Sequence, residues 1–318
     1  MQALLAGLVL GEDDGHGGRH PTQPRYGGAI ADELLVVDGD SMFFRAFHAL
    51  PTSIEGADGQ PVNALLGAVN LILQEVATFE TRAVVVCFGA EAAHYRVALF
   101  DGYHAARPEV PGELVAQFAA APAFLGAFGW TVARHDALEA DDLLGAYARR
   151  EAERGGRALV MTGDRDLFQC ADERVTILYV RTGRQGAERI DPEEVRRRYG
   201  VPPELVPDFI ALRGDPSDGI PGAKGIGEKT AADLLRRHGS LEETLAGALA
   251  ESRPSVRTAL CDGREQLLAF KEIATLRDVE VELPEDRPTD FTGAAAAARE
   301  HGMNRLAERL DRAARNGL

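Results

Sequence analysis

Eight acidic side chains lie in four short segments of this chain, and each segment falls where a predicted strand ends or a predicted helix begins. Acids brought together repel one another and resist burial unless a positive group joins them. Mg²⁺ and Mn²⁺ prefer oxygen ligands and are the natural partners of such a set. The pattern therefore predicts one divalent-metal site with phosphate chemistry, with candidate ligands Asp38, Glu139, Asp141, Asp142, Asp164, Asp166, Asp215 and Asp218.

Each segment taken alone has a simpler explanation. An Asp after a strand is commonly a turn or N-cap residue, and acids at a helix start interact favourably with the helix dipole. Glu139 and Asp142 are three residues apart and are expected to share a helix face, whereas Asp141 is expected to point elsewhere and to reach a metal through water. Four such segments, all at element ends, favour the shared site.

The elements around these acids predict an α/β fold with a mostly parallel sheet. Short apolar runs typical of buried strands alternate with segments of helical periodicity. Ligands of such sheets bind at the carboxyl ends of the strands, where Asp38 and the Asp164/Asp166 pair are expected. Predicted strands cover 34–37, 83–88, 129–134, 157–164 and 174–180, and predicted helices cover 63–79, 113–128 and 136–156.

After about residue 200 the pattern changes to short helices separated by Gly/Pro turns. Helices are predicted at 201–214 and 229–240, and the remainder to residue 318 is expected to be helical and rich in alanine. The loop from Gly222 to Thr230 lacks the Gly-Lys-Thr succession of a P-loop, because Glu228 intervenes. Its backbone amides, the following helix N-terminus, Lys224 and Lys229 predict a site for a DNA phosphate.

Composition is that of an ordinary globular protein, with 45% hydrophobic and 27% charged residues. The formal charge of −15 taken alone argues against a nucleic-acid partner. The eight clustered acids supply more than half of that charge, and the local electrostatic field, not the total charge, decides whether a polyanion binds. No apolar run is long enough to span a bilayer, and the start lacks the basic region of a signal peptide. Three separated cysteines indicate reduced thiols in the cytoplasm. Residues 1–30 are expected to be a disordered tail.

The chain resembles a known family at four motifs: LLVVDGDSMFFRAFHALP, LEADDLL, MTGDRDLFQC and ALRGDPSDGIPGAKGIGEKTA. The family is the 5′→3′ exonuclease/flap endonuclease group, in the bacterial form found as a stand-alone protein and as the N-terminal domain of DNA polymerase I. The resemblance implies a PIN-like, Rossmann-like nuclease core over 31–200 with an arch at about 94–125. It also implies a helix–three-turn–helix DNA-binding subdomain over 201–318.

The resemblance implies roles for individual residues. All eight acids match acidic family positions that hold two Mg²⁺ or Mn²⁺ ions, and a K⁺ ion is implied at the 222–230 loop. The implied catalytic residues are Asp38, Arg45, Asp141 and Asp164. The implied DNA contacts are Arg45, Arg96, Tyr103, Arg107, Gly222, Lys224, Gly225, Gly227, Lys229 and Thr230.

Two departures from the family pattern bear on activity. Gly89 stands where the family usually has a metal-binding Asp, so one metal site is expected to be weakened, with water or Glu91 as a replacement ligand. We expect Gly89→Asp to raise Mg²⁺-dependent cleavage. His104 stands where the arch usually has a Lys, which replaces a fixed charge with one expected to be mostly neutral at pH 7.

Three functions follow from these features. The first is a metal-dependent nuclease acting on DNA with a 5′ flap, nick or free 5′ end in replication and repair. It would be a monomer in the nucleoid region of the cytoplasm and work with a separate DNA polymerase. The second is a catalytically weakened flap-binding protein of the same fold. The third is a phosphatase of the haloacid dehalogenase class, whose DxD motif VVDGDSM mimics, although such an enzyme has no use for GIPGAKGIGEKTA.

Overall fold

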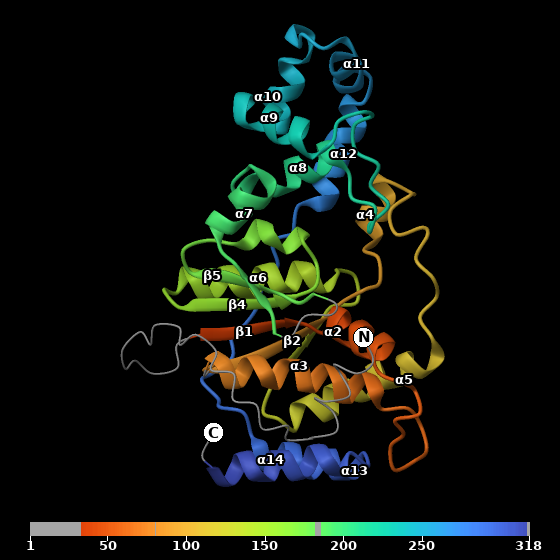
Figure 1. Cartoon of the computed structure of the whole chain (residues 1–318), viewed down its shortest axis with the longest axis vertical. Helices are drawn as coiled ribbons and strands as arrows, with labels where there is room; N and C mark the ends of the chain where they lie inside the picture. Colours follow the sequence, from red (N-terminus) through yellow and green to blue (C-terminus); the bar gives the residue numbers. More distant parts are fainter. Residues whose placement is uncertain (1–32, 80, 182–185, 317–318) are drawn as a thin grey trace, which may run out of the picture.

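The fold is a six-stranded sheet covered by helices on both faces (Figure 1). The helices α7 to α12 form a helical lobe at one end. A computed structural model describes residues 33–79, 81–181 and 186–316, so the expected tail at 1–30 lies outside the described residues. The strand order is β3-β2-β1-β4-β5-β6, and only β6 runs antiparallel to its neighbour. The strands are β1 (Glu33–Asp38), β2 (Ala83–Phe88), β3 (Thr131–Arg134), β4 (Arg157–Thr162), β5 (Val175–Tyr179) and β6 (Glu188–Ile190).

The central strands carry continuous apolar runs, as expected where both faces of a sheet are buried. Along β1, Leu34 and Val36 join one hydrophobic core, whereas Leu35 and Val37 join the other. This alternation follows from the two-residue repeat of a strand. The mostly parallel sheet is confirmed, and the three-residue strand β6 was not predicted.

The helices fall into groups that match the two cores. The first core packs α6 and the helical lobe against one face of the sheet, and the second packs α2, α3, α5, α13 and α14 against the other. The helices are α2 (Gly39–Ala49), α3 (Asn63–Phe79), α4 (His94–Leu99), α5 (Gly112–Gly126), α6 (Ala140–Glu153), α7 (Pro192–Tyr199), α8 (Val206–Arg213), α9 (Glu228–His238), α10 (Leu241–Ala246), α11 (Pro254–Asp262), α12 (Arg264–Ala274), α13 (Phe291–Glu300) and α14 (Asn304–Asn316), with 3₁₀ turns η1 (Asp166–Cys170), η2 (Pro203–Leu205) and η3 (Ala248–Ala250).

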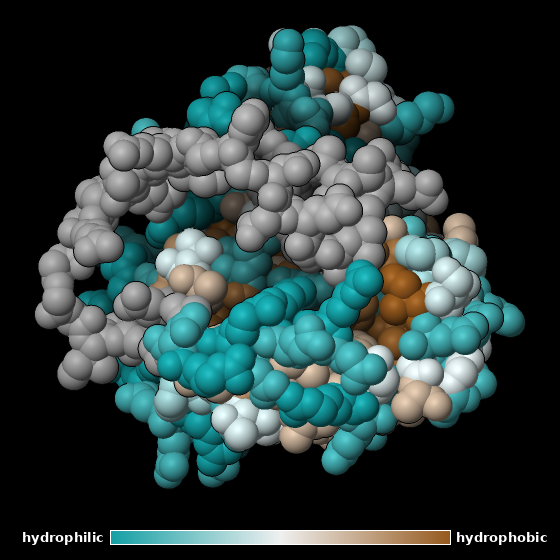
Figure 2. Space-filling view, turned by 60° about the horizontal axis from the view of Figure 1, so that its bottom comes forward, coloured by the Kyte–Doolittle hydropathy of each residue, from teal (hydrophilic) through white to brown (hydrophobic). Residues whose placement is uncertain are grey.

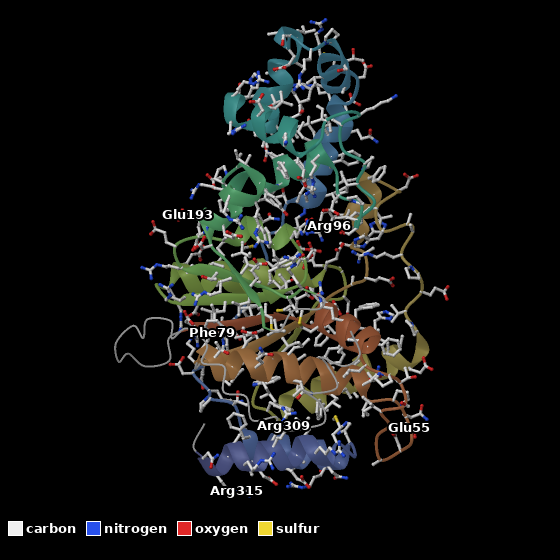
Figure 3. The ribbon with its side chains drawn as sticks, viewed as in Figure 1. Glu55, Phe79, Arg96, Glu193, Arg309 and Arg315 are labelled. Carbon is white, nitrogen blue, oxygen red and sulfur yellow. The ribbon has the colours of Figure 1, made fainter. Side chains whose placement is uncertain are left out.

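The C-terminal helices do not belong to the helical lobe, so the predicted subdomain 201–318 is wrong at its end. After α12 the chain returns along the sheet, and α13 and α14 pack beneath α3 and α5 at the opposite end of the molecule (Figure 1). Arg309, labelled in Figure 3, donates a hydrogen bond to Asn70 of α3 at 2.9 Å. The alanine-rich face of α13 permits this close packing, because Ala294, Ala295 and Ala298 are fully buried.

The outer side of this helical pair is polar. On α14, Leu306, Ala307 and Leu310 face the core, while charged and polar residues predominate on the rest of the helix surface. Figure 2 shows this end of the molecule turned toward the viewer, and most of the visible surface is hydrophilic. None of the helices in the described ranges is long and apolar enough to cross a bilayer.

Candidate active site

The candidate site lies at the carboxyl edge of the sheet, where β1, β2 and β4 end side by side. Asp38 ends β1 and caps α2: its Oδ1 accepts the N–H of Ser41 at 2.9 Å. Its Oδ2 accepts the hydroxyl of Thr162, the last residue of β4, at 2.7 Å. Asp38 is therefore the predicted N-cap residue and is also held in place by the neighbouring strand.

Acids from four chain segments surround one cavity of about 610 Å³ at this edge. Arg45, Arg107 and Arg134 bring positive charge to the same region, and residues 103–122 of the predicted arch segment form part of the wall. The sequence prediction that separate acid clusters converge is confirmed for these carboxylates. The acids lining the cavity are Asp38, Glu139, Asp141, Asp164 and Asp218 from the predicted segments, together with Asp40 and Glu91.

Asp215 and Asp166 lie beside this cavity. A second hollow is lined by Asp164, Asp215 and Ser217, so Asp164 borders both spaces. The N–H of Asp166 donates to Asp164 Oδ1 at 2.9 Å, and that of Ser217 donates to Asp215 Oδ1 at 2.8 Å. Both contacts join residues two apart in a turn. These acids therefore stabilise local turns, as the simpler explanation predicted, and also lie near the other acids of the site.

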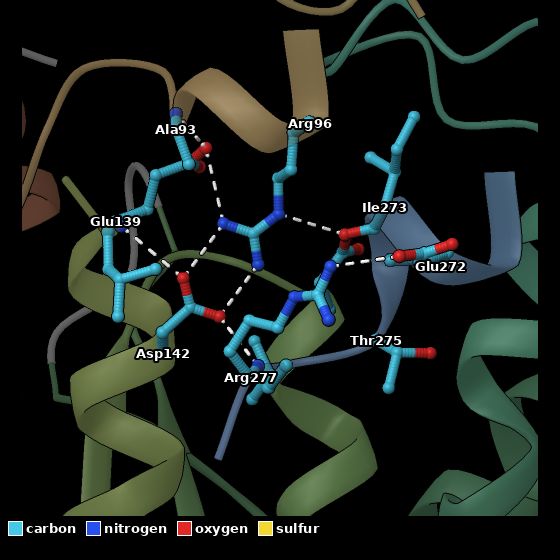
Figure 4. A network of polar contacts seen from close by, with 12 residues as sticks. Ala93, Arg96, Glu139, Asp142, Glu272, Ile273, Thr275 and Arg277 are labelled. Atoms are coloured by element: carbon cyan, nitrogen blue, oxygen red, sulfur yellow. Dashed lines mark hydrogen bonds and ion pairs between the residues drawn. The ribbon is translucent and has the colours of Figure 1, made fainter. Parts of the chain in front are cut away.

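Asp142 does not face the cavity, and the predicted roles of Asp141 and Asp142 are reversed. Asp142 has no exposed surface and accepts two hydrogen bonds from Arg96, at 2.8 and 3.0 Å (Figure 4). It also accepts the N–H of Arg277 at 2.8 Å. Its place at the third position of α6 turns the carboxylate behind the site, whereas Asp141 lines the cavity. We therefore withdraw Asp142 as a metal ligand.

The prediction that Arg96 contacts DNA is also wrong, whereas Tyr103 lines the cavity, so its predicted DNA contact stays a prediction. Arg96 is 3% exposed, pairs with Asp142 and Glu139, and donates through Nε to the carbonyl of Ile273 in α12. Figure 3 places it between the helical lobe and the sheet. Tyr103 is 5% exposed and its hydroxyl donates to Glu139 Oε2 at 2.8 Å. Both side chains position acids from inside the protein.

His104 is turned inward rather than presented as a surface charge. Its Nε2 lies 3.1 Å from Asp218 Oδ1, and its Nδ1 lies 3.0 Å from the carbonyl oxygen of Glu91. The ring therefore bridges Asp218 and the carbonyl of Glu91 instead of facing the solvent. Within the described ranges it is the one non-glycine residue with positive φ, 55°, and its ring stacks on Tyr103.

Two further predicted DNA contacts, Arg45 and Arg107, lie at the site. Arg45 donates through Nη2 to the carbonyl of Gly163 at 3.2 Å, next to Asp164. Burial raises the pKa of Asp38, and the charge of Arg45 offsets part of that rise. Arg107 is 40% exposed and donates to Asp218 Oδ1 at 3.1 Å. Burial acts to raise the pKa of Asp218, but the hydrogen bond and charge of His104, with the charge of Arg107, bring it below its usual value.

Four further carboxylates of the site have raised pKa values. Burial, and then the charge of Asp218, raise the pKa of Asp164 to about 7. Burial and the charge of Asp38 raise the pKa of Asp40 to about 7. Burial and the charge of Asp164 raise the pKa of Asp141 and Asp166 well above the usual range. Without an added positive charge, the site therefore favours protonated acids over a full set of carboxylates.

The donor set fits a hard divalent cation, because the cavity supplies many buried carboxylate oxygens and neither thiol nor imidazole dominates it. In the described part of the chain, no group of three or more carboxyl, imidazole or thiol groups already stands in position to hold an ion. Several oxygens are instead engaged by Ser41, Thr162, His104 and Arg107. The chemistry of the ligands is present, but a preassembled ligand shell is not.

Gly89 has no room for a side chain, which contradicts the expected gain from Gly89→Asp. A Cβ atom there would lie 2.2 Å from the backbone nitrogen of Ala140 and 2.6 Å from Cα of Glu139. The end of β2 therefore touches the start of α6 backbone to backbone. Sequence reasoning missed Asp40, which lines the cavity and accepts the N–H of Gly89 at 2.9 Å. The DGD sequence at the end of β1, which places a second Asp two residues after Asp38, could have indicated it.

The loop between α8 and α9 presents an open glycine-rich surface. Gly222 has φ of +66°, and a Cβ there would lie 2.3 Å from the nitrogen of Gly214, so only glycine fits this turn. A Cβ atom at Gly225 or Gly227 would meet no neighbour within 4 Å, and Lys224 and Lys229 are exposed. The backbone of this loop is therefore accessible to a ligand, and the phosphate site stays a prediction.

Comparisons with known proteins agree with this architecture. Residues 33–200 match the model of the 5′-3′ exonuclease N-terminal resolvase-like domain, and residues 201–294 match the 5′-3′ exonuclease C-terminal SAM fold. The chain belongs to the 5′-3′ exonuclease family. A protein named 5′-3′ exonuclease from Mycobacterium tuberculosis is 38% identical over 280 residues, which are 81% of this chain and 86% of that protein.

Other similar proteins are larger or more distant in sequence. DNA polymerase I of Mycobacterium leprae is 37% identical over 251 residues, or 76% of this chain, and the match spans only 27% of the polymerase. The fold is shared with bacteriophage T5 5′-exonuclease with bound zinc (TM-score 0.62, 19% identity, 87% of this chain and 98% of that one). It is also shared with the T5 flap endonuclease in a pseudo-enzyme-product complex with DNA and metal ions (TM-score 0.63, 16% identity, 87% and 97%).

Proposed function

We propose that this 5′-3′ exonuclease is a divalent-metal-dependent, structure-specific nuclease that hydrolyses phosphodiesters at 5′ ends and 5′ flaps of DNA in replication and repair. The observation that carries the proposal is the cavity in which acids from four segments meet Arg45 and Arg107. Family membership excludes the haloacid dehalogenase alternative. The T5 relatives with metal ions and with DNA support the choice of cofactor and substrate.

The proposed metal ligands form two neighbouring groups. Asp38, Glu139, Asp141, Asp164 and Asp218 line the main cavity, while Asp166 and Asp215 lie beside it toward the α8–α9 loop. Two bound Mg²⁺ or Mn²⁺ ions would supply an activated water and charge stabilisation for the leaving oxygen. Asp164 borders both spaces, so we propose that it belongs to both groups.

The remaining residues would hold the DNA. Arg45 is fixed to the carbonyl of Gly163 and so carries a positive charge beside Asp164, where it would orient the scissile phosphate. Arg107 would supply a second charge from the arch segment. The loop from Gly222 to Thr230 would bind the backbone of the duplex through its amides and Lys224 and Lys229, and we propose K⁺ as a counter-ion there.

The test is cleavage of a 5′-labelled flap duplex in Mg²⁺ and in Mn²⁺. Wild type should cut near the junction, and Asp164→Asn should abolish cleavage while retaining flap binding. Asp262→Asn, which removes an exposed acid of α11, is the matched control and should cleave normally. A wild-type protein that binds the flap but releases no product in either metal would overturn the nuclease proposal.

That second outcome describes the alternative, a flap-binding protein with weakened catalysis. The observation that favours this alternative is that Asp218, a proposed ligand, is already engaged by His104 and Arg107.

Free thiols at Cys87, Cys170 and Cys261 support the proposed cytoplasmic, nucleoid-associated setting. We further propose a monomer that works beside a separate DNA polymerase.

A further inference from the structure

Asp40 lies in the same cavity as the proposed metal ligands but is not among the eight acids predicted from the sequence. It is the second residue of α2 and lines the cavity together with Asp38, Glu139 and Asp141. Its Oδ2 accepts the N–H of Gly89 at 2.9 Å. Its Oδ1 has no hydrogen-bond partner among the residues that the structure describes. One oxygen therefore fixes the carboxylate and the other remains available.

The backbone beside Asp40 explains why an acid from α2 is needed there. At Gly89 the nearest atoms to a Cβ would be Ala140 N, at 2.2 Å, and the carbonyl carbon of Glu139, at 2.4 Å. The end of β2 cannot carry a side chain of its own without moving the start of α6, which presents Glu139 and Asp141. A carboxylate at this position must therefore reach over from the adjacent strand end, as Asp40 does.

We infer that Asp40 is a further carboxylate ligand of the metal site and occupies the place that Gly89 leaves without a side chain. This inference rests on the proposed function. Glu91 is the competing candidate and also lines the cavity, but its side chain is exposed, and its backbone carbonyl is the group that faces His104. The geometry favours Asp40 because its carboxylate is held against the strand end itself.

A purely structural role for Asp40 makes a different prediction. If it only secured the N–H of Gly89, Asp40→Asn would preserve function, because the amide oxygen of Asn accepts the same hydrogen bond. A metal ligand needs the charged carboxylate, so Asp40→Asn should fail in metal binding while folding normally. Asp40→Ala removes both features and should also lower the urea midpoint of unfolding.

The experiment is Mn²⁺ titration of the full-length protein without DNA, followed by calorimetry and by the electron paramagnetic resonance signal of free Mn²⁺. Asp40→Asn should weaken Mn²⁺ binding by at least about tenfold. Loss of a residue that only supports a metal ligand already lowers affinity by about that factor, so loss of a ligand should cost at least as much. Glu91→Gln and the exposed-acid control Asp262→Asn should bind as wild type does. Flap cleavage by Asp40→Asn should recover as Mn²⁺ is raised.

Asp164→Asn separates failure of this inference from failure of the proposed function. If Asp164→Asn weakens Mn²⁺ binding and Asp40→Asn does not, Asp40 is not a ligand and the proposed function stands. If Glu91→Gln alone weakens binding, Glu91 replaces it. If wild type binds no Mn²⁺, the metal-dependent function itself fails, and the inference fails with it.

Discussion

The pair formed by Arg96 and Asp142 gives the most decisive prediction, because sequence and structure assign Arg96 opposite roles. The guanidinium is 3% exposed and the carboxylate has no exposed surface. Replacing Arg96 by Met leaves Asp142 and Glu139 buried beside one another without their cation. Removing one partner of a buried ion pair costs about 3–5 kcal/mol. With a urea dependence of about 3 kcal/mol per molar, the unfolding midpoint should fall by about 1–2 M.

The assay is urea unfolding of wild type, Arg96→Met, Asp142→Asn and the double variant. Asn keeps an acceptor for the N–H of Arg277 while removing the uncompensated charge, so the double variant should be more stable than Arg96→Met alone. Arg107→Met is the matched control. Its side chain is 40% exposed, so its loss should change stability by no more than about 1 kcal/mol.

DNA binding supplies the outcome that would refute this reasoning. A residue that contacts phosphate contributes to the salt dependence of DNA affinity, and its removal lowers that dependence by about one unit of slope. We expect this effect for Arg107→Met and not for folded Arg96→Met. Unchanged stability of Arg96→Met together with a reduced salt slope would restore Arg96 as a DNA contact and contradict the buried network in Figure 4.

Three further predictions concern the DNA loop, the acids and the strand end. Lys224→Ala with Lys229→Ala should weaken duplex binding and lower the salt slope by about 2, measured by fluorescence anisotropy; an unchanged slope would exclude phosphate contacts by this pair. Burial raises the pKa of Asp164 to about 7, so the metal-free protein loses stability as pH rises from about 4 to 7, and protons compete with metal below pH 7. Thermal stabilisation by Mn²⁺ should therefore be larger at pH 8 than at pH 5.5, and equal shifts would contradict this. Gly89→Ala should lower the unfolding temperature, because its Cβ would lie 2.2 Å from Ala140 N; an unchanged temperature would mean that β2 and α6 separate readily.

The sequence alone predicted most of the sheet and the convergence of the acids, for a physical reason. The strands β1, β2 and β4 are continuous apolar runs, which fit only strands buried on both faces, and parallel strands bring their carboxyl ends to one edge. Asp38 ends β1 and Asp164 follows β4 after Gly163, so their meeting was determined by local pattern and strand direction. The glycine-rich loop was likewise predicted, because its turns require residues that tolerate positive φ.

Tertiary structure decided what each charged side chain faces. Which of Asp141 and Asp142 enters the cavity depends on the angle at which α6 starts, and Arg96 becomes an internal counter-ion only because α4, α6 and α12 meet around it. The return of α13 and α14 to the sheet depends on the path of 275–290, a segment without regular structure. The contact between Gly89 and α6, and with it the position of Asp40, involves residues some fifty positions apart. A local sequence pattern does not determine such a contact, because the contact depends on how closely two packed elements approach each other in space.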